Sequence, residues 1–136
     1  GRGFYGSRPD KAAAVAGLYK DVSIRPNIGS LRSELGMLKL QQQNYAEAAK
    51  HLAKAAELGV DDAPLYNFLG ISLSRTGELR KAVASYKRAL KLDPDLAEGH
   101  LNLGFALQRL NEPQTARKEY LEACRLEKKL CEFVRP

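Results

Sequence analysis

The feature that most constrains the fold of this sequence is a repeat with a period of 34 residues. A leucine–glycine pair recurs at this spacing, and its glycines are Gly36, Gly70 and Gly104. Each glycine is followed at fixed distances by an alanine, a large side chain and a second alanine, which form the columns Ala48/Ala82/Ala116, Leu52/Tyr86/Tyr120 and Ala55/Ala89/Ala123. A gapless pattern of this kind indicates an array of similar structural units, and the units span residues 29–62, 63–96 and 97–130.

The small residues of these columns predict close contacts between helices. Helix axes that cross at 8–10 Å need small side chains at the contact, and the glycine and first alanine columns supply them. Each unit is therefore predicted to consist of two amphipathic helices, and neighbouring units must stack to bury their apolar faces. The helices are expected at residues 28–42, 44–58, 63–76, 78–91, 95–109 and 112–132. No stretch alternates like a strand, so the predicted fold class is all-α.

Turn residues fall between these predicted helices. Gly77 suits a left-handed helix end, and Asn44 and Asn111 are the next best residues for that conformation. The acidic and proline-containing segments 61–64 and 93–95 are expected to begin the helices that follow them.

The spaced pattern resembles the tetratricopeptide repeat family over residues 29–130. The resemblance rests on the leucine–glycine pairs, the alanine columns, the aromatic column and Pro94. It implies a right-handed α-solenoid of about three and a half repeats. Val60 and Lys128 replace the proline that ends a repeat in this family.

The region before the first complete repeat keeps a trace of the same period. Ala14, Leu18 and Pro26 stand in register with residues of the later repeats. Residues 9–28 are therefore expected to form a degenerate half repeat, with a helix at 9–25. Residues 1–8 are expected to be a flexible leader, and 131–136 a C-terminal tail.

The resemblance also implies that the first helix of each repeat lines a concave groove that binds peptides. By register, the lining residues are Ser33, Met37, Leu40, Gln41, Asn67, Ile71, Ser74, Arg75, Leu101, Asn102, Phe105, Gln108 and Arg109. Met37, Ile71 and Phe105 make an apolar ladder with no core to fill, and such exposed patches mark binding sites. The alternative is that the curvature of the solenoid half-buries them.

The character of the groove predicts its ligand. Family members that bind chaperones clamp a C-terminal carboxylate with Lys and Asn, but the matching positions here are Ser33, Met37, Phe68, Glu98 and Asn102. Only the last fits, which disfavours the tail of a heat-shock chaperone. Because Arg75 and Arg109 remain at the edge of the groove, the expected ligand is a protein or peptide segment with apolar anchors and some acidic residues.

No catalytic, cofactor or metal site is predicted. The GxGxxG match at residues 1–6 lacks the preceding strand of a dinucleotide site. His51 and His100 occupy different repeat positions, so packing or solvent exposure explains them better than ligation. The composition is 44% hydrophobic and 28% charged, which disfavours disorder, and no apolar run is long enough to span a membrane.

The leading prediction is a non-enzymatic protein–protein interaction module, part of a larger protein or assembly. One alternative is a self-associating structural scaffold. A weaker alternative is a nucleic-acid-binding surface, because Arg80, Lys87 and Lys91 share one helix face and the net charge is +6. The interleaved acidic residues favour a solvated surface instead.

The C-terminal end carries two further expectations. Cys124 and Cys131 lie seven residues apart on one predicted helix, about 10.5 Å along its axis, which predicts free thiols because a disulfide needs closer Cα atoms. With that helix running to about Glu132, no residues remain for a capping helix. The uncovered apolar end would then include Leu103, Leu107, Tyr120, Leu121, Leu130 and Phe133. A tail that folds back is one way to cover it, but homo-oligomerisation through this end or further chain from the parent protein is preferred.

Overall fold

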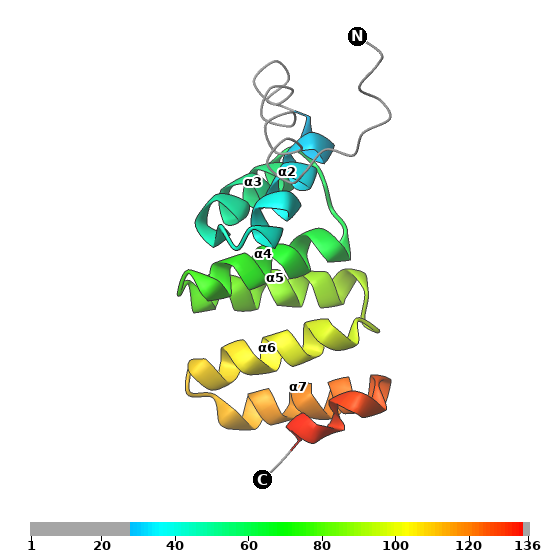
Figure 1. Ribbon diagram of the computed structural model, residues 1–136. Helices are drawn as coiled ribbons and strands as arrows, with labels where there is room; N and C mark the ends of the chain where they lie inside the picture. The colour runs from blue at the N-terminus through cyan, green and yellow to red at the C-terminus, as the bar shows by residue number, and fades with distance from the viewer. Residues whose placement is uncertain (1–27, 135–136) are drawn as a thin grey trace, which may run out of the picture.

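The computed structural model describes residues 28–134, and this part of the chain is helical without strands. Its helices are α2 (Gly29–Gln41), α3 (Tyr45–Glu57), α4 (Ala63–Arg75), α5 (Leu79–Leu92), α6 (Ala97–Arg109) and α7 (Pro113–Leu126), followed by the short 3₁₀ helix η2 (Lys128–Phe133). Figure 1 shows them stacked in chain order along one axis. The all-α prediction is confirmed, and the expected starts and ends of most helices agree with the structure within two residues.

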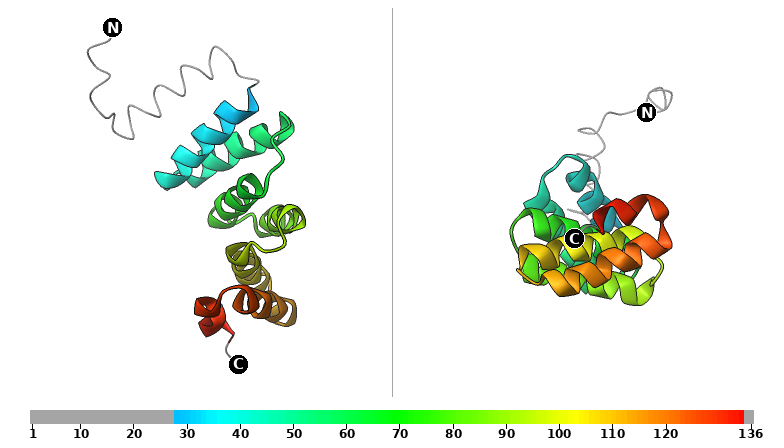
Figure 2. Two further views of the ribbon diagram at one scale, coloured as in Figure 1. Left: turned by 90° about the vertical axis from the view of Figure 1, so that its right-hand side faces the viewer. Right: turned by 90° about the horizontal axis from the view of Figure 1, so that it is seen from below.

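The helices are arranged as three antiparallel pairs. The most extensive contacts join α2 with α3, α4 with α5 and α6 with α7, and further contacts join each pair to the next. Successive pairs turn relative to one another, which Figure 2 shows from the side and from below. The result is a solenoid in which each pair buries its apolar face against its neighbours.

The glycine column permits the close packing inside each pair. A Cβ atom built on Gly70 would lie 2.5 Å from Cε1 of Tyr86, and one on Gly104 would lie 2.4 Å from Cε1 of Tyr120. Gly36 is related to Leu52 in the same way, with a distance of 2.6 Å to Cγ. The glycines therefore lie at close helix contacts, as predicted, and the structure adds that the large-residue column packs directly against them.

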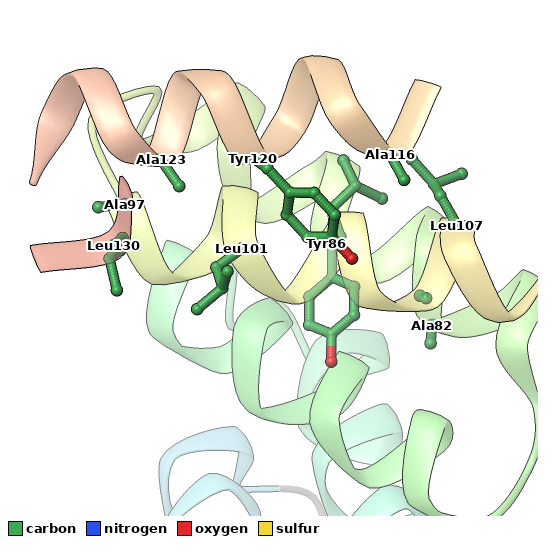
Figure 3. Close-up of a cluster of buried hydrophobic side chains, with 11 residues drawn as sticks. Ala82, Tyr86, Ala97, Leu101, Leu107, Ala116, Tyr120, Ala123 and Leu130 are labelled. Atoms are coloured by element: carbon green, nitrogen blue, oxygen red, sulfur yellow. The ribbon is translucent and has the colours of Figure 1, made fainter. Parts of the chain in front are cut away.

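The alanine columns face the same contacts. Ala116, Tyr120 and Ala123 point from α7 toward α6 (Figure 3) and are buried. Ala82 and Ala89 are fully buried on α5. Any larger side chain at these positions would have to displace a neighbouring helix.

The turns inside the pairs share one left-handed position. Gly77 and Asn111 have φ values of 87° and 65°, as expected, but in the first pair the residue with positive φ is Gln43, at 62°, and not Asn44. Gln43 is in register with the other two, whereas Asn44 is the residue that precedes α3. The expectation for Asn44 was wrong because the repeat register, rather than residue preference, determines the position.

The turns between the pairs agree with the expected caps only in part. Asp62 Oδ1 accepts a hydrogen bond from the backbone N–H of Leu65 at 2.9 Å and caps α4. Asp93 instead accepts from the backbone N–H of Asp95 inside the turn, at 3.1 Å, and α6 begins only at Ala97. The helix expected from residue 95 therefore begins two residues later.

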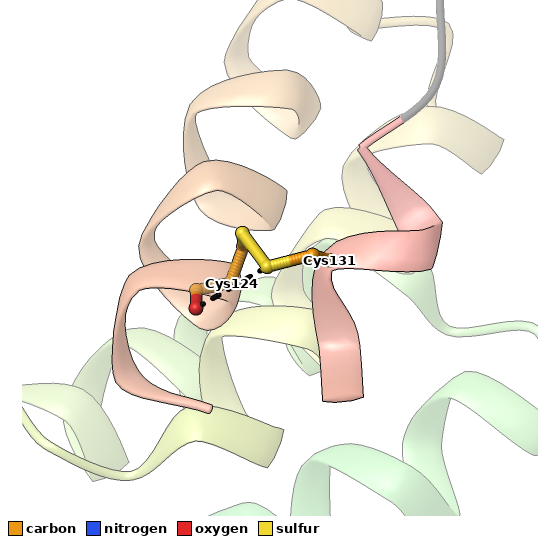
Figure 4. Close-up of a disulfide and its surroundings, with 2 residues drawn as sticks. All are labelled: Cys124 and Cys131. Carbon is orange, nitrogen blue, oxygen red and sulfur yellow. Dashed lines mark hydrogen bonds between the residues drawn. A yellow bond between two sulfur atoms is a disulfide. The ribbon is translucent and has the colours of Figure 1, made fainter. Parts of the chain in front are cut away.

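The C-terminal prediction was wrong. Helix α7 ends at Leu126, Glu127 is extended with φ −139° and ψ 115°, and η2 turns back along α7. This reversal brings the Cα atoms of Cys124 and Cys131 to 4.3 Å, and the two residues form a disulfide (Figure 4). The distance along a continuous helix did not apply because the helix stops between the two cysteines.

The end of the solenoid is therefore covered in part by its own chain. Leu130 is buried in the core cluster of the last two pairs, and Val134 packs against that cluster. The ring of Phe133 lies edge-on to Phe105 with centroids 5.4 Å apart. Leu121 remains exposed, with an exposed fraction of 47%. The fully uncovered apolar end on which the prediction of self-association rested is nevertheless not present in the structure.

The expected leader at 1–8 and the helix at 9–25 lie outside the described residues. Within residues 28–134, no helix has both the length and the apolar character needed to cross a membrane.

Candidate functional site

The first helices of the three pairs form the inner layer of the solenoid. Helix α4 contacts both α2 and α6 directly, whereas contacts between α3 and α5, or between α5 and α7, are weaker or absent in the described part of the chain. In a curved stack, the helices that approach one another lie on the concave side. Residues on the free face of α2, α4 and α6 are thus placed to meet a ligand together.

A pocket of about 340 Å³ opens between α4 and α6. Six of the thirteen residues predicted to line the groove meet in it, namely Ile71, Ser74, Arg75, Asn102, Phe105 and Arg109. They come from equivalent positions of two successive repeats, so the stacking of the repeats brings them together. The predicted residues of α2, which are Ser33, Met37, Leu40 and Gln41, are not among the residues that line this pocket.

Two guanidinium groups are held at this pocket by different contacts. Arg109 Nη1 donates to the carbonyl oxygen and to Oγ of Ser74, both at 3.3 Å. The guanidinium of Arg75 lies 5.3 Å from the ring centroid of Tyr45, a cation–π distance. Both arginines end their helices, where their charge also interacts favourably with the helix dipole.

Tyr86 of α5 also lines the pocket, and the sequence analysis missed it because it placed this residue only in the packing column. Its exposed fraction is 3%, and burial raises the pKa of its hydroxyl while the nearby charge of Arg75 acts in the opposite direction. The hydroxyl therefore stays protonated. A comparison of the repeats could have identified this residue. The tyrosine recurs one period later as Tyr120, whereas the polar residue near the tyrosine differs between the two repeats.

Two predicted groove residues lie in the interior instead. Leu101 has an exposed fraction of 8% and belongs to the core cluster of the last two pairs, so its assignment to the lining was wrong. Asn67 occupies the same column on α4 and is equally buried, at 7%. Its Oδ1 accepts a hydrogen bond from Nδ2 of Asn102 at 3.3 Å, which links α4 to α6. This column is therefore buried inside the stack and not on the free face of the inner layer.

The apolar ladder is less free than predicted. Met37 and Ile71 are half-buried against core clusters, as the alternative of a curved solenoid implied. Phe105 keeps an exposed fraction of 39%, although its ring contacts Tyr120 and Phe133. The exposed apolar surface of the inner layer is thus concentrated at Phe105. Gln108 is exposed near it, and its Oε1 accepts a hydrogen bond from the hydroxyl of Tyr120 at 2.6 Å.

A second hollow of about 650 Å³ lies between α3 and α5, over Leu69 and Leu73 of α4. Alanines supply much of its wall, so short side chains leave this space between the two second helices. At its rim Lys81 pairs with Glu78 at 3.4 Å, and Lys50 is a second cation in the lining. The exposed lining of this furrow is mostly apolar, whereas two arginines converge in the inner pocket, and we take the inner pocket as the better candidate site.

The histidines have structural contacts. Nδ1 of His100 lies 2.8 Å from Oε1 of Glu119, and its Nε2 lies 2.8 Å from the carbonyl oxygen of Pro94. His51 is buried, with Nδ1 3.3 Å from Nη1 of Arg32, and burial followed by the charge of Arg32 lowers its pKa. Among the described residues, no group of three potential ligands is placed to hold a metal ion.

Two of the basic residues of α5 form ion pairs. Arg88 forms two hydrogen bonds with the carboxylate of Asp61, at 2.7 and 3.2 Å, and lies over the ring of Tyr66. Lys81 is paired with Glu78. Arg80, Lys87 and Lys91, which share the predicted basic face, take no part in these pairs.

Comparison with known proteins points to one family of repeats. Residues 75–111 match the family model of the TPR (tetratricopeptide) repeat. Anaphase-promoting complex subunit 3 of Dictyostelium discoideum is 32% identical over 77 residues, which make up 57% of this chain and 8% of that protein. The chain therefore spans less than a tenth of the length of this relative.

Solved structures share the solenoid fold. The crystal structure of MamA aligns with a TM-score of 0.88 at 20% identity, over 92% of this chain and 75% of that one. YrrB, described as a TPR protein with an unusual peptide-binding site, aligns with a TM-score of 0.81 at 19% identity, over 87% and 61% of the two chains. The family model thus shows a tetratricopeptide repeat at residues 75–111, in agreement with the 34-residue pattern, and the likeness to these structures shows the solenoid fold.

Proposed function

We propose that this chain is a non-enzymatic protein–protein interaction module that binds a peptide segment in its concave groove, as part of a larger protein or assembly. The observation that supports this function is the pocket between α4 and α6, where apolar and cationic side chains converge from two repeats. Ile71 and Phe105 offer apolar surface, and Arg75 and Arg109 offer positive charge. An extended peptide with apolar anchors and acidic residues matches both properties.

The comparisons supply context for the proposal. The neighbour YrrB is described as having a peptide-binding site. The relative from Dictyostelium is by its name a subunit of a complex, and the present chain matches only 8% of its length. A binding arm within a larger protein or assembly is consistent with both.

The test begins with an unbiased search for ligands. A phage-displayed library of random peptides is selected on the immobilised 136-residue chain, and the best peptide is synthesised and titrated by fluorescence anisotropy. We expect enriched peptides that combine apolar and acidic residues. Ile71→Asp is expected to weaken binding by at least about tenfold, because it places a charge in the apolar wall of the pocket.

A matched variant separates this effect from a general effect of charge. Leu92→Asp adds the same charge to an apolar residue that is 39% exposed at the end of α5, outside the pocket. Circular dichroism verifies that both variants remain helical. If no peptide is enriched, or if Ile71→Asp binds the peptide as tightly as Leu92→Asp does, the proposed groove is wrong.

A further inference from the structure

The pocket between α4 and α6 has an electrostatic imbalance. It is lined by two arginines and by no acidic residue. Neither Arg75 nor Arg109 forms an ion pair with a carboxylate within residues 28–134, although several other cations there do, including Lys39, Arg88 and Arg125. Arginine stays charged at any physiological pH, so the pocket keeps its positive charge.

The tyrosine in this pocket supplies an independent observation. Tyr86 is 3% exposed and lines the pocket, yet its hydroxyl has no hydrogen-bond partner in the described part of the chain. The hydroxyl is not among the buried side-chain atoms that lack a partner, so it reaches the open space of the pocket and is available to a ligand. A ligand atom that accepts a hydrogen bond would satisfy this donor.

The equivalent tyrosine of the next repeat does have a hydrogen-bond acceptor within the chain. The hydroxyl of Tyr120, one period later, donates to Oε1 of Gln108 at 2.6 Å. One period before Gln108 stands Ser74, whose shorter side chain is already an acceptor for Arg109. Because the earlier repeat has Ser74 where the later one has Gln108, it lacks an internal acceptor for the tyrosine hydroxyl and leaves space beside Tyr86.

We infer that this space is an oxyanion subsite of the groove, which takes the carboxylate of a Glu or Asp side chain from the bound peptide. The carboxylate would accept hydrogen bonds from the Tyr86 hydroxyl and from the guanidinium groups of Arg75 and Arg109, which suit it because a guanidinium binds a carboxylate through two parallel bonds. Ile71 and Phe105 would contact the methylene groups of the same side chain. The inference rests on the proposed peptide groove and adds which side chain the peptide places there.

The test is a double-substitution cycle with the peptide selected as described above. The peptide is compared with its Glu→Gln or Asp→Asn counterpart, on the full chain and on Arg109→Gln, Arg75→Gln and Tyr86→Phe variants. We expect each arginine variant to weaken binding of the acidic peptide by about tenfold, as for the loss of a charge-assisted hydrogen bond. The neutral peptide should bind the parent and the variants with similar affinity, because the partner charge is absent.

Arg117→Gln on α7 is the matched control, since Arg117 is exposed and lies outside the pocket. It should change the affinity of neither peptide. Raising the salt concentration should weaken the binding of the acidic peptide to the parent chain more than the binding of the neutral peptide.

Three results would overturn the inference. If Arg75→Gln and Arg109→Gln bind the acidic peptide like the parent while Ile71→Asp still abolishes binding, the groove stands and the carboxylate subsite is wrong. If a phosphoserine version binds at least about tenfold tighter than the carboxylate version and loses that gain in Arg109→Gln, the subsite is for phosphate instead. Loss of the Ile71→Asp effect itself would remove the groove and the subsite together.

Discussion

At the scale of single residues, two tyrosines in one repeat column have different roles. Tyr86 and Tyr120 both pack over a glycine of the preceding helix, but only Tyr120 has a hydrogen-bond acceptor for its hydroxyl among the described residues. Packing and polar pairing are therefore separable at this position. The difference arises from the polar neighbours Ser74 and Gln108 and is invisible if each tyrosine is considered alone.

Removing the two hydroxyl groups tests this difference. Tyr120→Phe loses a hydrogen bond and should lower the free energy of unfolding by about 0.5–1.5 kcal/mol. Tyr86→Phe removes a hydroxyl that faces the pocket and makes no hydrogen bond to another described residue, so it should leave that free energy unchanged. Urea unfolding followed by circular dichroism measures both. Equal losses for the two variants would mean that Tyr86 has an internal partner.

The alanine column predicts a packing effect. Ala82 is fully buried in the core, so Ala82→Leu should overpack the site and lower the stability by about 1–3 kcal/mol. Ala84 lies two residues further along α5 and is exposed, and Ala84→Leu should change the stability by less than about 0.5 kcal/mol. Thermal unfolding of both variants is the measurement. An unchanged melting temperature for Ala82→Leu would mean that the repeat register is wrong.

At the scale of elements, η2 is the part of the chain that departs most from the repeat pattern. It follows α7 after an extended Glu127 and is joined to that helix by the disulfide between Cys124 and Cys131. Leu130 fills the core, and Phe133 covers one edge of Phe105. A short tail thus takes part of the role that a longer capping helix has in other solenoids.

Breaking the disulfide should weaken this element. The closed loop is short, and the chain-entropy estimate for a loop of this size is about 2–3 kcal/mol of stability. The parent should therefore melt at a lower temperature in dithiothreitol, and Cys131→Ser should melt at that lower temperature with or without it. Hydrogen exchange should show faster exchange of the η2 amides in the variant. Two thiols that react with an alkylating reagent in the oxidised parent would contradict the pairing.

At the scale of the whole molecule, the folded-back tail decides what the end of the solenoid presents to solvent. Leu130 is buried and Phe105 contacts Phe133, so less apolar surface is exposed at this end, although Leu121 remains 47% exposed. We therefore expect that two copies of the chain do not associate through this end while the tail covers it.

Analytical ultracentrifugation over a range of concentrations tests this expectation. The oxidised parent should keep the mass of a monomer. Cys131→Ser should show a mass that rises with concentration, because release of η2 exposes Phe105 and the site of Leu130. Adding Leu121→Glu to that variant should restore the monomer. Association of the oxidised parent that Leu121→Glu abolishes would instead support the self-associating scaffold.

The repeat architecture followed from local features of the sequence. Helix positions depend on a 3.6-residue apolar period, and the contacts within a pair depend on small residues at fixed spacing, such as Gly70 and Ala82. Both are repeated three times, so neighbouring copies support the same register. The common left-handed position at Gln43, Gly77 and Asn111 was also contained in that register.

Other features depend on surfaces that are assembled only when the repeats stack. Residues 127–134 follow a path on which Leu130 enters the core cluster and Phe133 contacts Phe105, and no spacing within the tail encodes it. The pocket joins side chains that are about one period apart, and Tyr86 enters it from a third helix. Local patterns therefore specified the helices and their pairing, whereas the reversal of the tail and the meeting of Arg75, Tyr86 and Arg109 required the three-dimensional packing of the repeats.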